Sequence, residues 1–132
     1  MLGVRTYTRG YVDGCRARID ADLAAYDAAA AGAEFGDFEA TFFNNMVLVL
    51  DHYFVHRLRT VEGKDGNPLN EVRVVSDSLM LNNGIMTADK TINLDPAKSV
   101  LNYAPGDRIK LGKGDFERLC DAYFAEIQGK FT

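Results

Sequence analysis

Apolar residues recur every three or four positions in four stretches of the chain, which is the spacing of one face of an α-helix. The first stretch covers about five turns with the stripe Val12, Cys15, Ile19, Leu23, Tyr26 and Ala30. The second begins after Asp37, a good N-cap, with the stripe Phe43, Met46, Leu50, Tyr53, Arg57 and Val61. The pattern therefore predicts a second helix that runs without a break from residue 38 through Val61.

This second helix is apolar on more than one face, because Val47, Leu48, Val49 and Val55 lie off the stripe. A helix that is apolar nearly all round is buried nearly all round. We expect it in the middle of the bundle, with more apolar surface than one neighbouring stripe covers. The excess predicts a homodimer.

The next two helices have clear boundaries. Gly63 suits the left-handed position at a helix end, Asn67 is an N-cap, and Pro68 is tolerated at a first helical position. We expect the third helix over residues 68–82, antiparallel to the second. The last helix is expected over residues 113–131, with the stripe Phe116, Leu119, Cys120, Tyr123, Ile127 and Phe131.

Residues 85–112 break the helical pattern. Two short runs, 91–94 and 108–111, alternate between apolar and polar residues, and Pro105-Gly106 before the second run is a turn signal. These features predict a two-stranded β ribbon. The fold class is therefore mostly α, an antiparallel four-helix bundle with a small two-stranded β insertion before the last helix, in a single domain over residues 1–132.

Charge argues against a nucleic-acid partner. The chain has a net charge of −4, and nucleic-acid binders usually carry a basic face that releases counterions. Between residues 13 and 39 there are seven acidic residues and only two arginines. We expect that face to repel nucleic acid.

Hydropathy and cysteine usage favour a soluble cytoplasmic protein. The longest apolar block, residues 42–50, is interrupted by two asparagines and is far shorter than the ~20 residues that span a bilayer. The first residues lack the apolar core of a signal peptide. Cys15 and Cys120 fall on apolar stripes, so we interpret them as reduced core residues.

Both histidines lie in the second predicted helix. His52 and His56 are four residues apart, the spacing at which a helix places two imidazoles on one metal ion. A catalytic zinc site needs a third protein ligand, which would be a carboxylate such as Asp77, Glu71 or Asp121. The alternative is one surface histidine and one histidine hydrogen-bonded between helices. A divalent metal is thus a candidate cofactor, and no other cofactor is expected.

A polar cluster crowds the end of the helical hairpin where the second and third helices meet. Its candidate ligand-binding residues are Arg57, Arg59, Glu62, Asn67, Asn70, Glu71 and Arg73. Two arginines and the backbone N–H groups at a helix N-terminus could hold a small anionic ligand, a phosphate or a carboxylate. The alternative is structural, because the acids of the cluster nearly neutralise its cations and could form caps and ion pairs with them.

The histidine late in the second helix of a four-helix domain resembles the DinB and YfiT family of metal-dependent helical enzymes. That family uses a three-histidine site whose other ligands come from a later helix, where this chain has no histidine. The run VHRLRTVEGKDGNPLNEVR, residues 55–73, resembles an uncharacterised family of small helical proteins from actinobacteria. This second resemblance implies a bacterial cytoplasm and no particular activity.

Three hypotheses about function follow. The first is a non-enzymatic interaction or assembly domain that forms homodimers, because no nucleophile lies beside a base and no phosphate-binding glycine motif occurs. The second is a module that binds an anion or another small molecule at the polar cluster. The third is a metal-dependent enzyme built on His52 and His56.

Overall fold

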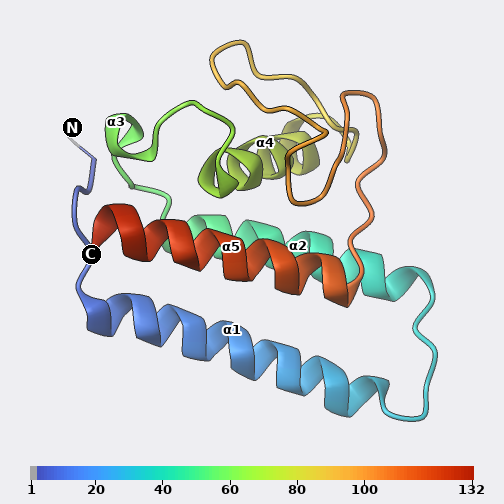
Figure 1. Cartoon of the computed structure of the whole chain (residues 1–132). Coiled ribbons are helices and arrows are strands. Elements are labelled where there is room, and N and C mark those ends of the chain that lie inside the picture. Colours follow the sequence, from blue (N-terminus) through green and yellow to red (C-terminus); the bar gives the residue numbers. More distant parts are fainter. Residues whose placement is uncertain (1–2) are drawn as a thin grey trace.

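The computed structural model describes residues 3–132, and it is mostly helical (Figure 1). Four long helices and one single-turn helix occur in this part of the chain: α1 (Arg9–Ala30), α2 (Asp37–Tyr53), α3 (Arg59–Glu62), α4 (Pro68–Leu81) and α5 (Lys113–Phe131). The predicted third and fourth long helices are confirmed as α4 and α5. None of the helices is long and apolar enough to cross a membrane.

The helices form layers around α2 and α5, which lie side by side and run in the same direction (Figure 1). Helix α1 packs on α5 from one side, and α4 packs on both central helices from the other. The core they enclose is aliphatic and aromatic, and its largest fully buried side chains include Phe43, Phe54, Phe116, Tyr123 and Phe131.

The second helix ends two turns earlier than its apolar stripe predicts. Helix α2 stops at Tyr53, and the chain turns before α3 begins at Arg59. The N-terminal segment takes part in this break, because Val4 donates its N–H to the His56 carbonyl (2.7 Å) and accepts from the Leu58 N–H (2.8 Å). These backbone bonds replace the helical ones, and they come from a segment about fifty residues away in sequence.

The predicted β ribbon does not form. Among residues 3–132 there is no strand, and the segment before α5 has a single bridge, between Ile85 and Arg108. The side chain of Asn44 in α2 takes the place of a strand partner: its Nδ2 donates to the Ile109 carbonyl (3.0 Å), and its Oδ1 accepts from the Leu111 N–H (3.1 Å). The period-two pattern therefore reflects burial of alternate residues against the bundle, and the prediction of a two-stranded β insertion was wrong.

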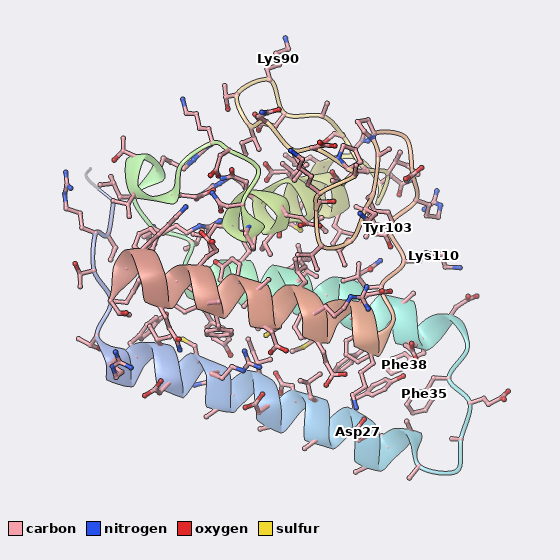
Figure 2. The ribbon with its side chains drawn as sticks, viewed as in Figure 1. Asp27, Phe35, Phe38, Lys90, Tyr103 and Lys110 are labelled. Carbon is pink, nitrogen blue, oxygen red and sulfur yellow. The ribbon has the colours of Figure 1, made fainter. Side chains whose placement is uncertain are left out.

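At the other end of the molecule, aromatic rings close the turn between α1 and α2. Phe35 and Phe38 lie there with ring centroids 5.1 Å apart (Figure 2). Phe35 also packs on Tyr26 of α1 at 5.6 Å, while Phe38 remains half exposed. This cluster lies far along α2 from the polar residues at the hairpin end.

Candidate functional site

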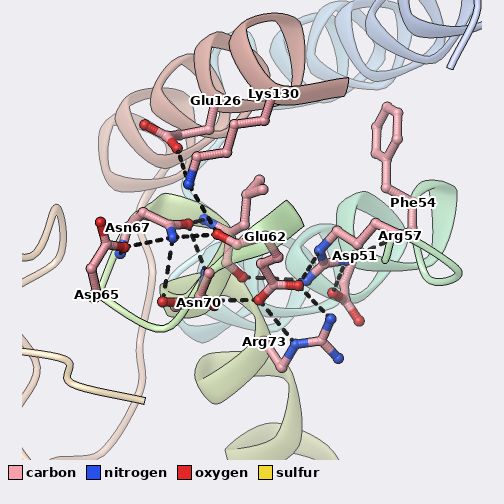
Figure 3. Close-up of polar contacts among 12 residues, drawn as sticks. Asp51, Phe54, Arg57, Glu62, Asp65, Asn67, Asn70, Arg73, Glu126 and Lys130 are labelled. Atoms are coloured by element: carbon pink, nitrogen blue, oxygen red, sulfur yellow. Dashed lines mark hydrogen bonds and ion pairs between the residues drawn. The ribbon is translucent and has the colours of Figure 1, made fainter. Parts of the chain in front are cut away.

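The polar cluster at the hairpin end is organised around the Glu62 carboxylate (Figure 3). It accepts hydrogen bonds from Arg57 Nε (2.8 Å), Asn70 Nδ2 (2.8 Å) and two nitrogens of Arg73, Nε (3.1 Å) and Nη2 (2.6 Å). Glu62 is the last residue of α3, Arg57 lies in the turn after α2, and the other two belong to α4. One carboxylate thus joins three segments of the chain.

Arg57 is enclosed by groups of the protein. Its Nη1 donates to an Asp51 carboxylate oxygen (3.1 Å) and to the Phe54 carbonyl (3.0 Å), and its Nη2 donates to the Leu69 carbonyl (3.3 Å). The guanidinium also lies over the Tyr123 ring, 5.7 Å from its centroid. Because the side chains of Arg57 and Glu62 are both 0% exposed, a ligand cannot reach either group in this conformation.

The surroundings of Arg57 and Glu62 favour the charged form of both side chains. Burial alone raises the pKa of Glu62, but the hydrogen bond from Arg73, the charges of Arg57 and Arg73, and the Asn70 amide together bring that pKa below its ordinary value. A buried carboxylate and a buried guanidinium are stable only with such complete pairing. The cluster therefore works first as a lock between α2, α3 and α4.

The N-terminus of α4 is capped from within the chain. Asn67 Oδ1 accepts from the N–H groups of Leu69 (2.9 Å) and Asn70 (3.3 Å), and its Nδ2 donates to the Glu62 carbonyl (2.8 Å). Lys130 Nζ donates to the same carbonyl (2.9 Å). The backbone donors that the sequence offered to an anion are thus occupied by Asn67, whose role as N-cap is confirmed.

We expect Asn67→Ala to lower the melting temperature by a few degrees, because losing an N-cap costs about 1 kcal/mol and the side chain makes a further bond to the Glu62 carbonyl. Thermal unfolding followed by circular dichroism measures the change. Asn82→Ala is the control, because Asn82 is an exposed asparagine at the other end of α4. An equal shift in both variants would contradict a special role for Asn67.

Two of the predicted ligand-binding residues, Glu71 and Arg59, make no hydrogen bond with the Glu62 carboxylate. Glu71 is buried and points to the segment before α5, where its two oxygens accept from the Val100 and Leu101 N–H groups, both at 2.8 Å. Burial raises its pKa, against the opposing effect of these two hydrogen bonds. Arg59 is exposed, and its side chain makes no hydrogen bond or ion pair with any residue from 3 to 132. Ligand binding by the seven predicted residues remains a prediction.

The histidines do not share a helix face. His52 is in the last turn of α2, whereas His56 follows the end of the helix, and both are exposed. No group of three or more His, Cys, Asp or Glu side chains in residues 3–132 is placed to hold a metal ion. The predicted i, i+4 pair is therefore not formed, because α2 ends between its two members.

An apolar groove between α2 and α4 was not foreseen as a site. It has a volume of about 500 Å³ and is lined by Leu48, Val49 and His52 from α2 and by Ser76, Asp77 and Met80 from α4, among others. Burial raises the pKa of Asp77, and the charge of Asp51 adds to this effect. One feature of the sequence indicated this groove: the apolar residues of α2 that lie off its main stripe, such as Leu48 and Val49.

Within residues 3–132, two polar groups of this groove have no partner in the chain. The Asp77 carboxylate forms neither a hydrogen bond nor an ion pair. The Ser76 hydroxyl is buried and unbonded, whereas the hydroxyl of Ser78, in the same helix, donates to the Val74 carbonyl at 2.7 Å. Buried polar groups are normally satisfied, so an unbonded hydroxyl beside a groove is a group that a binding partner could complete.

A second hollow, of about 370 Å³, lies where the chain turns from α2 into α3. Its lining includes the polar residues His56, Arg57, Arg59, Thr60 and Arg73 and no carboxylate. Val55 and Leu58 contribute apolar surface. The molecule thus has an apolar groove that contains an unpaired acid, Asp77, and a separate basic hollow lined by Arg59 and Arg73. The chain matches no protein-family model, no curated protein and no solved structure.

Proposed function

We propose that this protein is a non-enzymatic interaction domain that self-associates through the groove between α2 and α4. The observation that carries the proposal is the exposed apolar edge of this groove. Met80 lines it and is 67% exposed, and the next residue, Leu81, is 83% exposed, the highest value among the exposed large hydrophobic residues from 3 to 132. Clustered apolar exposure beside an apolar groove is typical of a protein–protein interface.

The groove extends this edge into a continuous surface. Leu48 and Val49 of α2 are half-buried on its floor, although their neighbours Val47 and Leu50 are fully buried in the core. Fully burying a large apolar side chain contributes roughly 1.5–3 kcal/mol. Covering Met80, Leu81 and the groove floor would therefore stabilise a complex by several such increments.

A second copy of the chain fits this surface because its hydrogen-bonding groups are self-complementary. His52 stands on the α2 wall and the unpaired Asp77 on the α4 wall. In a two-fold symmetric dimer whose axis runs along the groove, a residue on one wall of one copy meets the opposite wall of the other. His52 of each copy would then face Asp77 of the other, which gives the unpaired carboxylate a partner.

The proposal includes the bacterial cytoplasm as the site of action and requires no cofactor. Both cysteines support a reducing compartment, because Cys15 and Cys120 are free and buried in the core. Burial raises the pKa of Cys120 to about 12, so this thiol is not activated at neutral pH.

Light scattering at micromolar concentration tests the proposal. We expect a mass near twice the 14.6 kDa of one chain, and a single-chain mass for the double variant Met80→Lys, Leu81→Lys. Because both side chains are exposed, the variant should keep the helical circular dichroism and the melting behaviour of a folded monomer.

The control is Phe38→Lys, which places one lysine on a half-exposed hydrophobic residue at the start of α2. It should leave the dimer intact. A single-chain mass for the unmodified protein up to the highest micromolar concentration would overturn the proposal. A dimer that survives the double substitution would also contradict this choice of interface.

A further inference from the structure

We propose that the basic hollow beside α3 binds a phosphate group. Among its polar lining residues, Arg59 and Arg73 have accessible guanidinium groups, and Thr60 adds a hydroxyl. This site has its own lining residues, none of them shared with the proposed dimer groove, although Asp77 of the groove lies close enough to feel the charges of Arg59 and Arg73. It also differs from an anion site built on Arg57 and the α4 N-terminus, whose donors the chain itself occupies.

Arg73 is held in place with unused donors. Its Nε and one Nη2 hydrogen are bonded to Glu62, which leaves three of the five N–H donors of a guanidinium without a partner in residues 3–132. The far edge of the group points away from Glu62 (Figure 3), and the side chain is 18% exposed. The buried carboxylate therefore fixes the orientation of this guanidinium before a ligand arrives, which reduces the entropy lost on binding.

Arg59 supplies the second cation. Two carboxylates, Asp77 and Asp89, are close enough to feel its charge, yet neither forms an ion pair with it. Deeper in the cluster, Asp51 and Glu62 compensate only two of the three guanidinium charges of Arg57, Arg59 and Arg73. In residues 3–132 the guanidinium of Arg59 therefore has no direct ion pair and keeps its donors for a ligand, in a protein whose net charge is −4.

The donor set favours phosphate over a single carboxylate. Two guanidinium groups and a hydroxyl approach from different segments, α4 and α3, and a tetrahedral phosphate presents oxygens in several directions at once. Exposed Val55 and half-buried Leu58 in the same hollow would contact an organic group attached to the phosphate. The ligand class is therefore inorganic phosphate or a small phosphomonoester, and the test separates the two.

The test is a calorimetric titration of the full chain with sodium phosphate and, separately, with phenyl phosphate, whose organic part is apolar, at constant ionic strength adjusted with sodium chloride. We expect saturable binding of both, and tighter binding of the monoester because Val55 and Leu58 contact its ring. Because Arg59 donates charge-assisted hydrogen bonds to the anion, Arg59→Ala should weaken binding about tenfold or more. Arg59→Lys keeps the positive charge but lacks the planar guanidinium. Its affinity for phosphate should lie between that of the unmodified protein and that of Arg59→Ala.

Arg59→Ala should fold normally, because the side chain has no partner to lose among residues 3–132. Its matched control is Arg108→Ala, which removes an exposed arginine from the loop before α5 and should leave phosphate binding unchanged. Equal weakening in both variants would show general charge attraction and overturn the proposal. Absence of saturable phosphate binding by the unmodified protein would overturn it as well, whatever its oligomeric state.

Discussion

Glu62→Ala is expected to lower the free energy of unfolding by about 3–5 kcal/mol, because it leaves the buried Arg57 guanidinium without its main counter-ion. A chain of this length has a total stability of roughly 7–20 kcal/mol, so the variant should be close to unfolding at 37 °C. Urea titration at pH 7 measures the change. Glu34→Ala, at an exposed glutamate in the turn between α1 and α2, is the control and should change little.

The stability lost when the Glu62 carboxylate is removed should depend on pH. The pKa of Glu62 is lower in the folded protein than its usual value, so the folded state favours the ionised form. Its contribution is therefore fully present above the unfolded pKa of about 4.3 and is lost as the pH falls through the lower, folded value. The stability gap between the unmodified protein and Glu62→Gln should narrow below about pH 4. A gap that stays constant down to pH 2 would contradict an ionised Glu62.

Glu71→Ala is expected to cost about 2–6 kcal/mol, because it leaves the Val100 and Leu101 N–H groups without an acceptor, at about 1–3 kcal/mol each. The effect should concentrate in the segment between α4 and α5. Hydrogen exchange at these two amides should accelerate more than exchange within α5. The exposed Glu117→Ala, in α5, serves as the control. Unchanged exchange at Val100 and Leu101 would show that other contacts hold the segment.

The pH dependence at Glu71 has the opposite sign. Burial raises its pKa in the folded protein, so the folded state favours the protonated form. This contribution is present below about pH 4.3 and is lost as the pH rises through the folded pKa. The stability gap between the unmodified protein and Glu71→Gln should therefore shrink toward neutral pH, whereas the gap at Glu62 grows. One pH series of urea titrations on both glutamine variants distinguishes the two roles.

Local sequence determined most of the helices, but not the separate roles of Glu62 and Glu71. The apolar stripes of α1, α4 and α5, the Asn67 cap and the Pro68 start depend on residues within one or two turns of each other, and all of them form as the sequence predicts. The polar run between α2 and α4 was also recognisable as a cluster. Charge type and spacing alone, however, did not distinguish Glu62, which closes the cluster, from Glu71, which points away from it.

Tertiary structure decided the features that depend on distant partners. Helix α2 ends at Tyr53 although its apolar stripe continues, because Val4 bonds to the backbone of His56 and Leu58. The expected ribbon is a loop, because Asn44 takes the hydrogen bonds that a second strand would have made. Periodicity reports which residues are buried, but it does not report what buries them. The basic hollow beside α3 lies at the break after Tyr53, and the groove between α2 and α4 follows from the packing of these two helices, so neither could be predicted from local sequence.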